Sequence, residues 1–350
     1  MQVLISNFLR VFRPETSYAP NVSSRVEVAT EIDAEIVSAE TRRWILLAIG
    51  SIVIAGLLSL AVVIGRLPFI SQFIDDPLWF KRCLVVHVDL ALVVWFYAFI
   101  AGLISLVKKG SESAIRKGAF IVSVVGVVGM LMGGVAKGAQ PVLANYIPVI
   151  DHPFFLGGLG LFFLGVIGQF VHALISSKRE SASLALPAWV PSEAAIGLQA
   201  SAIVVVLAGA TWISTTAGMP GNLDIETHFE FSVWGAGHVL QVANVAAMLA
   251  VWMWLMKRAT GQSLFAPRQA NMVFGTLIAP HFIMPILTLR GPLDTIYHSG
   301  ATFLMRWCIF PVTLFVLIRG VQHLQRHRAG ISTWTQKMAR SGFYASAGLT

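Results

Sequence analysis

Long runs of hydrophobic residues alternate with short polar segments along most of the chain. A helix needs about 20 mainly apolar residues to cross the hydrocarbon core of a bilayer, and runs of this kind recur eight times. The pattern therefore predicts an all-α protein, a polytopic bundle of about eight transmembrane helices. The predicted spans cover residues 44–66, 83–106, 118–136, 154–177, 194–213, 231–256, 270–288 and 300–318.

Composition supports a membrane protein over a soluble one. Of the 350 residues, 56% are hydrophobic and only 12% are charged, and the mean hydropathy is +0.74, values outside the range of ordinary soluble domains. We predict an N-terminal arm over 1–43, a helix bundle over 44–320 and a basic tail over 321–350. The apolar run at residues 2–9 is too short for the core of a signal peptide, so no cleaved leader is expected.

The distribution of positive charge predicts the orientation of the chain, because loops rich in Lys and Arg stay in the cytoplasm. With both termini inside, 19 of the 25 Lys and Arg residues lie in inner segments, five lie in outer segments, and Arg306 lies within the last span. Both termini are therefore predicted to be cytoplasmic, in a bacterial or archaeal cell membrane. The net charge of +8 is spread over every inner segment, which does not indicate a nucleic-acid partner.

Histidines are the main candidates for chemistry. At about 1.5 Å per helical residue, His87, His238 and His281 lie roughly 6 to 10 Å inside the predicted outer ends of three different spans. His298 lies at the outer rim. Neutral imidazole is the commonest protein ligand of haem iron, copper and zinc. A single buried histidine is more often a packing residue, but three at one depth favour a metal or haem site. The two cysteines, Cys83 and Cys308, form no ligand spacing.

Asp89 and Arg306 are ionisable residues within predicted spans, at nearly the depth of these histidines. Such a group costs at least ~2.5 kcal/mol on insertion scales, so it normally faces a cavity or a partner. Two interpretations stay open. The pair forms an ion pair that joins the second and eighth helices, or Arg306 is the counter-ion of an anionic cofactor group such as a haem propionate.

Two segments around these histidines resemble a known family. LVVHVDLALVVWFYAFIAGLISLV, around His87, resembles the second helix of the catalytic subunit of haem-copper oxidases and nitric oxide reductases, and FSVWGAGHVLQVANVAAMLAVWMWL, around His238, resembles the sixth. The resemblance implies that His87 ligates a low-spin haem near the outer face and that His238 ligates copper. The predicted topology agrees with that family, in which the second helix enters from the outside.

The chain also departs from this family. LIAPHFIMPIL falls where the family's seventh helix carries paired histidines, yet only His281 is present and Phe282 follows it. The tyrosine and the acid that many oxidases place after the sixth-helix histidine are replaced by Val242 and Leu240. The family's tenth helix supplies two further axial ligands, and this chain has eight predicted spans. A complete oxygen-reducing centre is therefore not expected in this chain alone.

The resemblance favours a membrane-bound respiratory electron-transfer subunit that binds haem b, with copper as a second candidate cofactor. Other subunits of a respiratory complex and a c-type cytochrome or quinol donor are the expected partners. One alternative is an oxidoreductase, a terminal oxidase or nitric oxide reductase subunit completed by other chains. Another is a non-redox membrane sensor or transporter that binds protons or a small ligand. No catalytic residue is predicted.

Overall fold

The computed structural model describes residues 38–107, 113–180 and 190–349. Within these residues, eight helices are long and apolar enough to cross a membrane, which confirms the predicted all-α polytopic bundle. The first span is α3 (Ala39–Gly65). The second is divided into α5 (Trp79–Val88), η1 (Asp89–Val94) and α6 (Trp95–Val107). Four uninterrupted helices follow: α7 (Ala114–Val135), α8 (Pro153–Glu180), α9 (Ser192–Ala217) and α10 (Ile225–Thr260).

The last two spans are interrupted. The seventh consists of α11 (Pro267–Ile278), η2 (Ala279–Ile283), α12 (Met284–Leu287) and η3 (Thr288–Arg290). Pro280 and Pro285 lie within it, and proline removes a backbone donor from a helix interior. The eighth consists of α13 (Thr295–Leu304), η4 (Met305–Ile309) and α14 (Phe310–Arg326).

Short elements lie between and after the spans. The single turn α4 (Pro68–Ser71) follows the first span. Between α7 and α8, β1 (Gln140–Val142) pairs antiparallel with β2 (Val149–Asp151), and this hairpin packs against α5 and α10. After the last span come η5 (Arg328–Gly330) and α15 (Trp334–Gly348).

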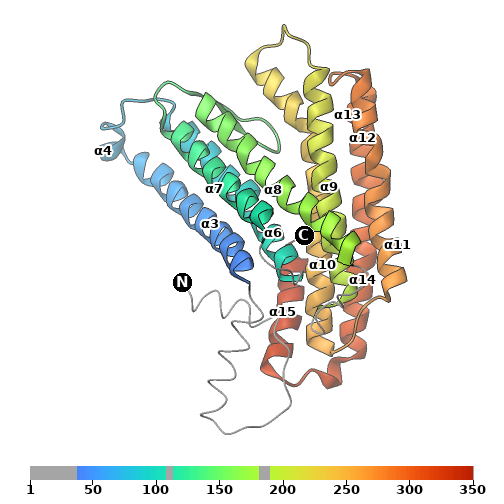
Figure 1. Ribbon diagram of the computed structural model, residues 1–350. Helices are drawn as coiled ribbons and strands as arrows, with labels where there is room; N and C mark the ends of the chain where they lie inside the picture. The colour runs from blue at the N-terminus through green and yellow to red at the C-terminus, as the bar shows by residue number, and fades with distance from the viewer. Residues whose placement is uncertain (1–37, 108–112, 181–189, 350) are drawn as a thin grey trace.

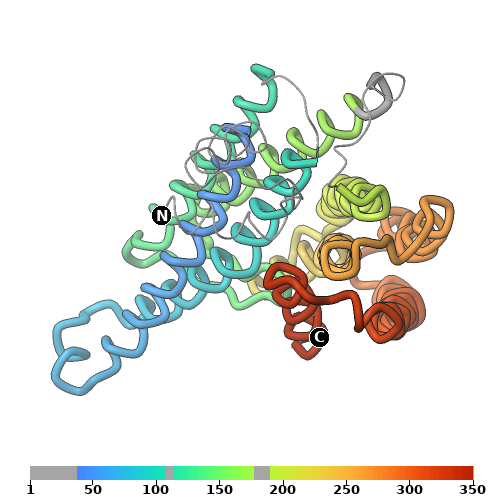
Figure 2. Tube along the Cα trace, turned by 90° about the horizontal axis from the view of Figure 1, so that it is seen from below, coloured from blue at the N-terminus to red at the C-terminus, as the bar shows by residue number. Residues whose placement is uncertain are grey.

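The spans are arranged in two groups that follow chain order (Figures 1 and 2). α3, the second span, α7 and α8 lie together, and α9 to α14 lie together beside them. Contacts of α8 and α6 with α9 connect the two groups. Many large apolar side chains on the outside of the bundle are exposed, among them Leu57 at 61% and Leu164 at 62%. Lipid tails are the solvent that such a surface requires, so the chain is a multi-pass membrane protein.

The two ends of the bundle differ from the predicted boundaries. Helix α3 begins at Ala39, where the Ser38 side chain accepts a hydrogen bond of 3.1 Å from the Thr41 amide. Part of the predicted arm therefore belongs to the first membrane helix, and residues 1–37 lie outside the described residues. The predicted polar tail contains α15, which packs on α10 because Trp252 donates a 2.8 Å hydrogen bond to Ser346 and its ring contacts Phe343.

Helices α7 and α8 approach each other closely through glycines. A Cβ built on Gly126 would lie 2.4 Å from the Phe162 amide nitrogen and 2.5 Å from the Gly158 carbonyl oxygen. Small residues allow this kind of backbone contact in membranes, where van der Waals packing replaces the hydrophobic effect as the force between helices.

We expect Gly126→Ala to separate α7 from α8, because the added methyl group meets backbone atoms that cannot rotate away. The free energy of unfolding should fall by roughly 1–3 kcal/mol, the usual cost of overpacking. Unfolding by dodecyl sulfate in mixed micelles, followed by tryptophan fluorescence, measures this. Gly118→Ala in the same helix is the matched control, since nothing lies within 4 Å of its Cβ position. Equal stability of the two variants would contradict the prediction.

Candidate functional site

His238 forms the centre of a cluster of aromatic and imidazole side chains. It lies on α10 and is 8% exposed. Its Nδ1 is 2.9 Å from the Trp234 carbonyl oxygen and therefore donates, which leaves Nε2 to accept a 2.9 Å hydrogen bond from the Tyr146 hydroxyl. Both imidazole nitrogens are thus hydrogen-bonded, and the tautomer is set by these two partners.

Tyr146 was not identified from the sequence. It lies in the turn of the β1–β2 hairpin and is the one non-glycine residue with a positive φ in the described chain, at 69°. Gly237 makes room for it, because a Cβ there would lie 2.4 Å from the ring of Tyr146. Burial raises the pKa of Tyr146 to about 12, and nearby Glu230 adds to the shift. The phenol therefore stays protonated and available as a donor at neutral pH.

The remaining members of the cluster are Trp234, on the same helix as His238, and two histidines from the seventh and eighth spans. The Trp234 ring lies between His238 and His298, with centroid distances of 4.0 and 4.3 Å. His298 Nε2 is 2.9 Å from the Pro292 carbonyl oxygen. His281 is 2% exposed, its Nδ1 is 3.0 Å from the Leu277 carbonyl oxygen, and it interacts electrostatically with His238. We call Tyr146, Trp234, His238, His281 and His298 the histidine cluster.

The structure thus brings His238 near both His281 and His298. Among the described residues, no three His, Cys, Asp or Glu side chains are placed to hold one metal ion. His238 Nε2, which a copper ion would need, accepts from Tyr146. The predicted copper ligands therefore come together as a hydrogen-bonded cluster.

His87 and Asp89 lie on the second span, apart from these contacts. His87 is partly buried, with Nδ1 2.8 Å from the Ala55 carbonyl oxygen of α3. No partner of its Nε2 is found in the described part of the chain. Asp89 is fully buried, and neither of its carboxyl oxygens has a hydrogen-bond partner there. An unpartnered buried carboxyl group is costly and is a candidate for function.

Arg306 is not the partner of Asp89. Its side chain is exposed and lines a groove on the outside of the bundle, together with His298 and Trp307. The ion pair considered as one interpretation of Asp89 and Arg306 is therefore not formed.

Three predicted residues coincide with breaks in regular α-helix. Asp89 begins the π-helical turn η1, Arg306 lies in the π-helical turn η4, and His281 lies in the 3₁₀ turn η2. Such irregular turns are frequent at functional sites because they redirect side chains. The sequence singled out Asp89 and Arg306 by charge and His281 as a possible ligand, and the backbone geometry distinguishes all three independently.

A second polar network was missed because its members stand at the ends of the predicted spans. Glu40 of α3 forms an ion pair with Arg116 of α7. Its Oε1 also accepts hydrogen bonds from Ser105, at 2.9 Å, and from Gln169. All four side chains are buried. The network therefore joins α3, α6, α7 and α8 near the first turns of α3 and α7.

Arg82 is a further buried charged residue, although the predicted topology places it in an outer segment. It is 1% exposed, pairs with Asp76, and donates to the Gly134 carbonyl oxygen at 3.2 Å. The guanidinium holds the pKa of Asp76 below its ordinary value. The hydrogen bond from Arg82 to the Gly134 carbonyl oxygen connects α5 to the end of α7.

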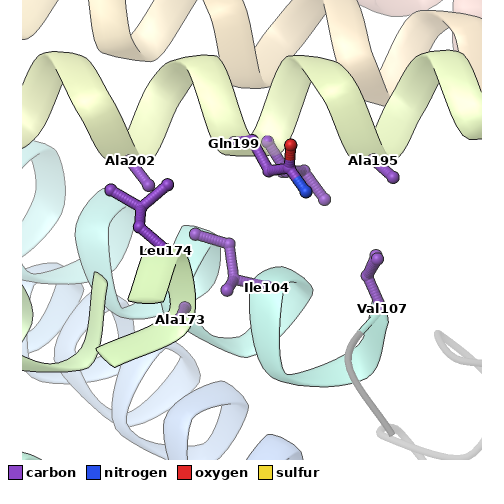
Figure 3. A pocket seen from close by; sticks show the side chains of 8 residues that line it. Ile104, Val107, Ala173, Leu174, Ala195, Gln199 and Ala202 are labelled. Carbon is purple, nitrogen blue, oxygen red and sulfur yellow. The ribbon is translucent and has the colours of Figure 1, made fainter. Parts of the chain in front are cut away.

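A small cavity lies where α6, α8 and α9 meet (Figure 3). Its volume of ≈ 20 Å³ is enough for about one water molecule. The lining is apolar apart from Gln199. It offers no chemistry comparable with that of the histidine cluster.

Comparison with known proteins leaves the family open. No protein-family model and no solved structure matches the chain. An uncharacterized protein of Aquifex aeolicus (strain VF5) is 31% identical over 216 residues, which cover 61% of this chain and 53% of that protein. An uncharacterized protein of Rickettsia prowazekii (strain Madrid E) is 22% identical over 291 residues, which cover 72% of this chain and 52% of that protein. The chain thus spans about half the length of these curated relatives, and neither name states an activity.

The Glu40 network yields a stability prediction. Arg116→Met leaves the Glu40 carboxylate buried without its cation. Removing one partner of a buried ion pair typically lowers the free energy of unfolding by about 3–5 kcal/mol. The double variant Glu40→Gln with Arg116→Met should lose less, because no charge stays buried. Unfolding in mixed micelles measures both. Lys117→Met is the matched control, since Lys117 is adjacent and exposed. A double variant that is less stable than Arg116→Met would contradict this account.

Proposed function

We propose that this chain is a haem-binding electron-transfer subunit of a bacterial respiratory membrane complex. The observation that carries the proposal is the environment of His87. Its Nδ1 is held by a backbone carbonyl, and its Nε2 has no partner among the described residues. Histidines that ligate metals usually donate their other ring N–H to a carbonyl or carboxylate in this way, which fixes both the tautomer and the ring orientation.

In this proposal the second span would hold the iron of a b-type haem through one histidine. His87 would supply the ligand nitrogen. A bound haem would supply one-electron chemistry near one face of the membrane. The resemblance of this segment to the second helix of haem-copper oxidases supports the same ligand.

A copper ion does not fit the histidine cluster as it stands, because Nε2 of His238 is hydrogen-bonded to Tyr146. We therefore propose no copper centre and no oxygen reduction by this chain alone. The cluster can do simpler chemistry. The Tyr146 hydroxyl and His238 Nε2 share one proton across 2.9 Å, so the pair can hold a proton and orient the imidazole.

One observation favours a second candidate, a proton-coupled membrane transporter or sensor without haem. Asp89 is buried within a span and has no partner in the described chain, which is typical of proton-carrying carboxyl groups in transporters. The absence of a haem spectrum in the purified protein would favour this candidate over the first.

For orientation, we propose that both termini are cytoplasmic, on the basis of the excess of Lys and Arg in the inner segments. A cysteine introduced at Asn222, between α9 and α10, should react with a membrane-impermeant maleimide added outside intact cells. A cysteine at Ser113, at the start of α7, should be protected until the cells are lysed. Cys83→Ser and Cys308→Ser provide the background for both variants. The reverse labelling pattern would overturn the orientation.

For haem ligation, we expect His87→Ala to abolish or shift the reduced-minus-oxidised spectrum of the purified protein, because a methyl group cannot ligate iron. A pyridine haemochrome assay on the same sample measures whether haem is retained. His323→Ala is the control: His323 is hydrogen-bonded to Thr260 at 2.9 Å, near the C-terminal end of α10. A purified protein without haem, or a spectrum that is unchanged in His87→Ala, would refute the assignment.

A further inference from the structure

A groove on the exposed side of the last span has polar residues along its length. Its volume is ≈ 390 Å³. Phe303 and Trp307 flank it, with 60% and 61% of their surfaces exposed. The polar residues that line it are Thr295, His298, Ser299, Thr302 and Arg306.

The only cation in this lining lacks a counter-ion. Arg306 has no hydrogen-bond or ion-pair partner among residues 38–107, 113–180 and 190–349. By contrast, Arg82 and Arg116, the buried arginines of the bundle, are both paired with carboxylates. An arginine within a span is costly unless it meets an anion or reaches the interface, so a ligand with negative charge would stabilise Arg306 in this groove.

The spacing of the polar residues gives the groove a direction. Positions 295, 298, 299, 302 and 306 recur every three or four residues and form one stripe along the helix. Helical side chains lean toward the N-terminus of their helix, so Arg306 extends toward Thr302 and the helix start. Thr295 is the first residue of α13. The polar lining therefore runs about 16 Å, at ~1.5 Å per residue, from Arg306 to the helix end that meets the membrane interface.

We propose that this groove binds the headgroup of an anionic phospholipid, with Arg306 paired to its phosphate. The phosphodiester is ionised at every physiological pH, and the guanidinium can donate two parallel hydrogen bonds to it. The acyl chains would lie against Phe303, Trp307 and the exposed apolar residues of α14, which begin with Phe310 at 61% exposure. This inference does not depend on haem binding.

A lipid fits this surface better than a helix of another protein does. The polar lining extends to the interface, where lipid headgroups lie. An acidic side chain of a neighbouring helix would need only Arg306, so it would not account for the other polar residues of the lining. Apolar side chains border the polar stripe. Together these features match a molecule that has one charged end and apolar tails.

Native mass spectrometry of the delipidated protein, titrated with phosphatidylglycerol, tests the proposal. Wild type should bind one phosphatidylglycerol more tightly than phosphatidylcholine. Arg306→Gln should weaken that binding roughly tenfold, as expected for loss of a charged hydrogen-bond partner, and Arg306→Lys should restore part of it. Arg290→Gln is the matched control, because Arg290 is also exposed but is already paired with Asp294 at 3.5 Å. Gel filtration of each variant verifies that it is folded.

Two results would overturn the proposal. The first is equal affinity of wild type and Arg306→Gln for phosphatidylglycerol, or equal affinity of wild type for the two lipids. The second comes from a photoreactive benzophenone amino acid placed at position 303 and irradiated in native membranes. A lipid adduct at this position supports the proposal, whereas an adduct to another protein chain would mean that the groove is a subunit interface.

Discussion

The low dielectric of the lipid interior controls where this chain can place charge. An ionised side chain in a span is stable only with a partner or with access to the interface, and most buried charges of the bundle follow this rule. Glu40 pairs with Arg116, and Arg82 pairs with Asp76. The Glu40–Arg116 pair connects α3 to α7, and Arg82 connects α5 to α7 through its hydrogen bond to the Gly134 carbonyl oxygen. The contacts that compensate these charges therefore also hold helices of the first group of spans together.

Among the described residues, Asp89 and Arg306 are two exceptions, and both functional hypotheses rest on them or on their neighbours. Asp89 is buried without a partner, and Arg306 faces outward into a groove. Each lies in a π-helical turn. An extra residue in a helical turn rotates the side chains that follow it relative to those before it, so a span can present a polar residue at one point and an apolar face elsewhere. The break in helical geometry and the uncompensated charge are thus parts of one local arrangement.

The histidine cluster follows a different principle, since each of its imidazoles is held by a hydrogen bond to a backbone carbonyl oxygen. Tyr146 reaches His238 because a hairpin between α7 and α8 folds over α5 and because Gly237 has no side chain to block the ring. Tyr146 and His238 are 92 residues apart in the sequence. This arrangement orients the imidazole strongly, but it also uses the nitrogen that a metal would need.

The eight spans were determined by the sequence itself, because the length of an apolar run is a local property and lipid permits few other structures. The same local contrast identified Asp89, Arg306 and the histidines, since an ionisable residue stands out within an apolar run. Tertiary structure alone decided which of them meet. Whether Arg306 pairs with Asp89 or faces lipid depends on how each helix is rotated, and rotation follows from the packing of small residues such as Gly126 against neighbouring backbone. Glu40 and Arg116 stayed hidden for a related reason: at the edge of a span a charged residue is ordinary, and only the neighbouring helices make it buried.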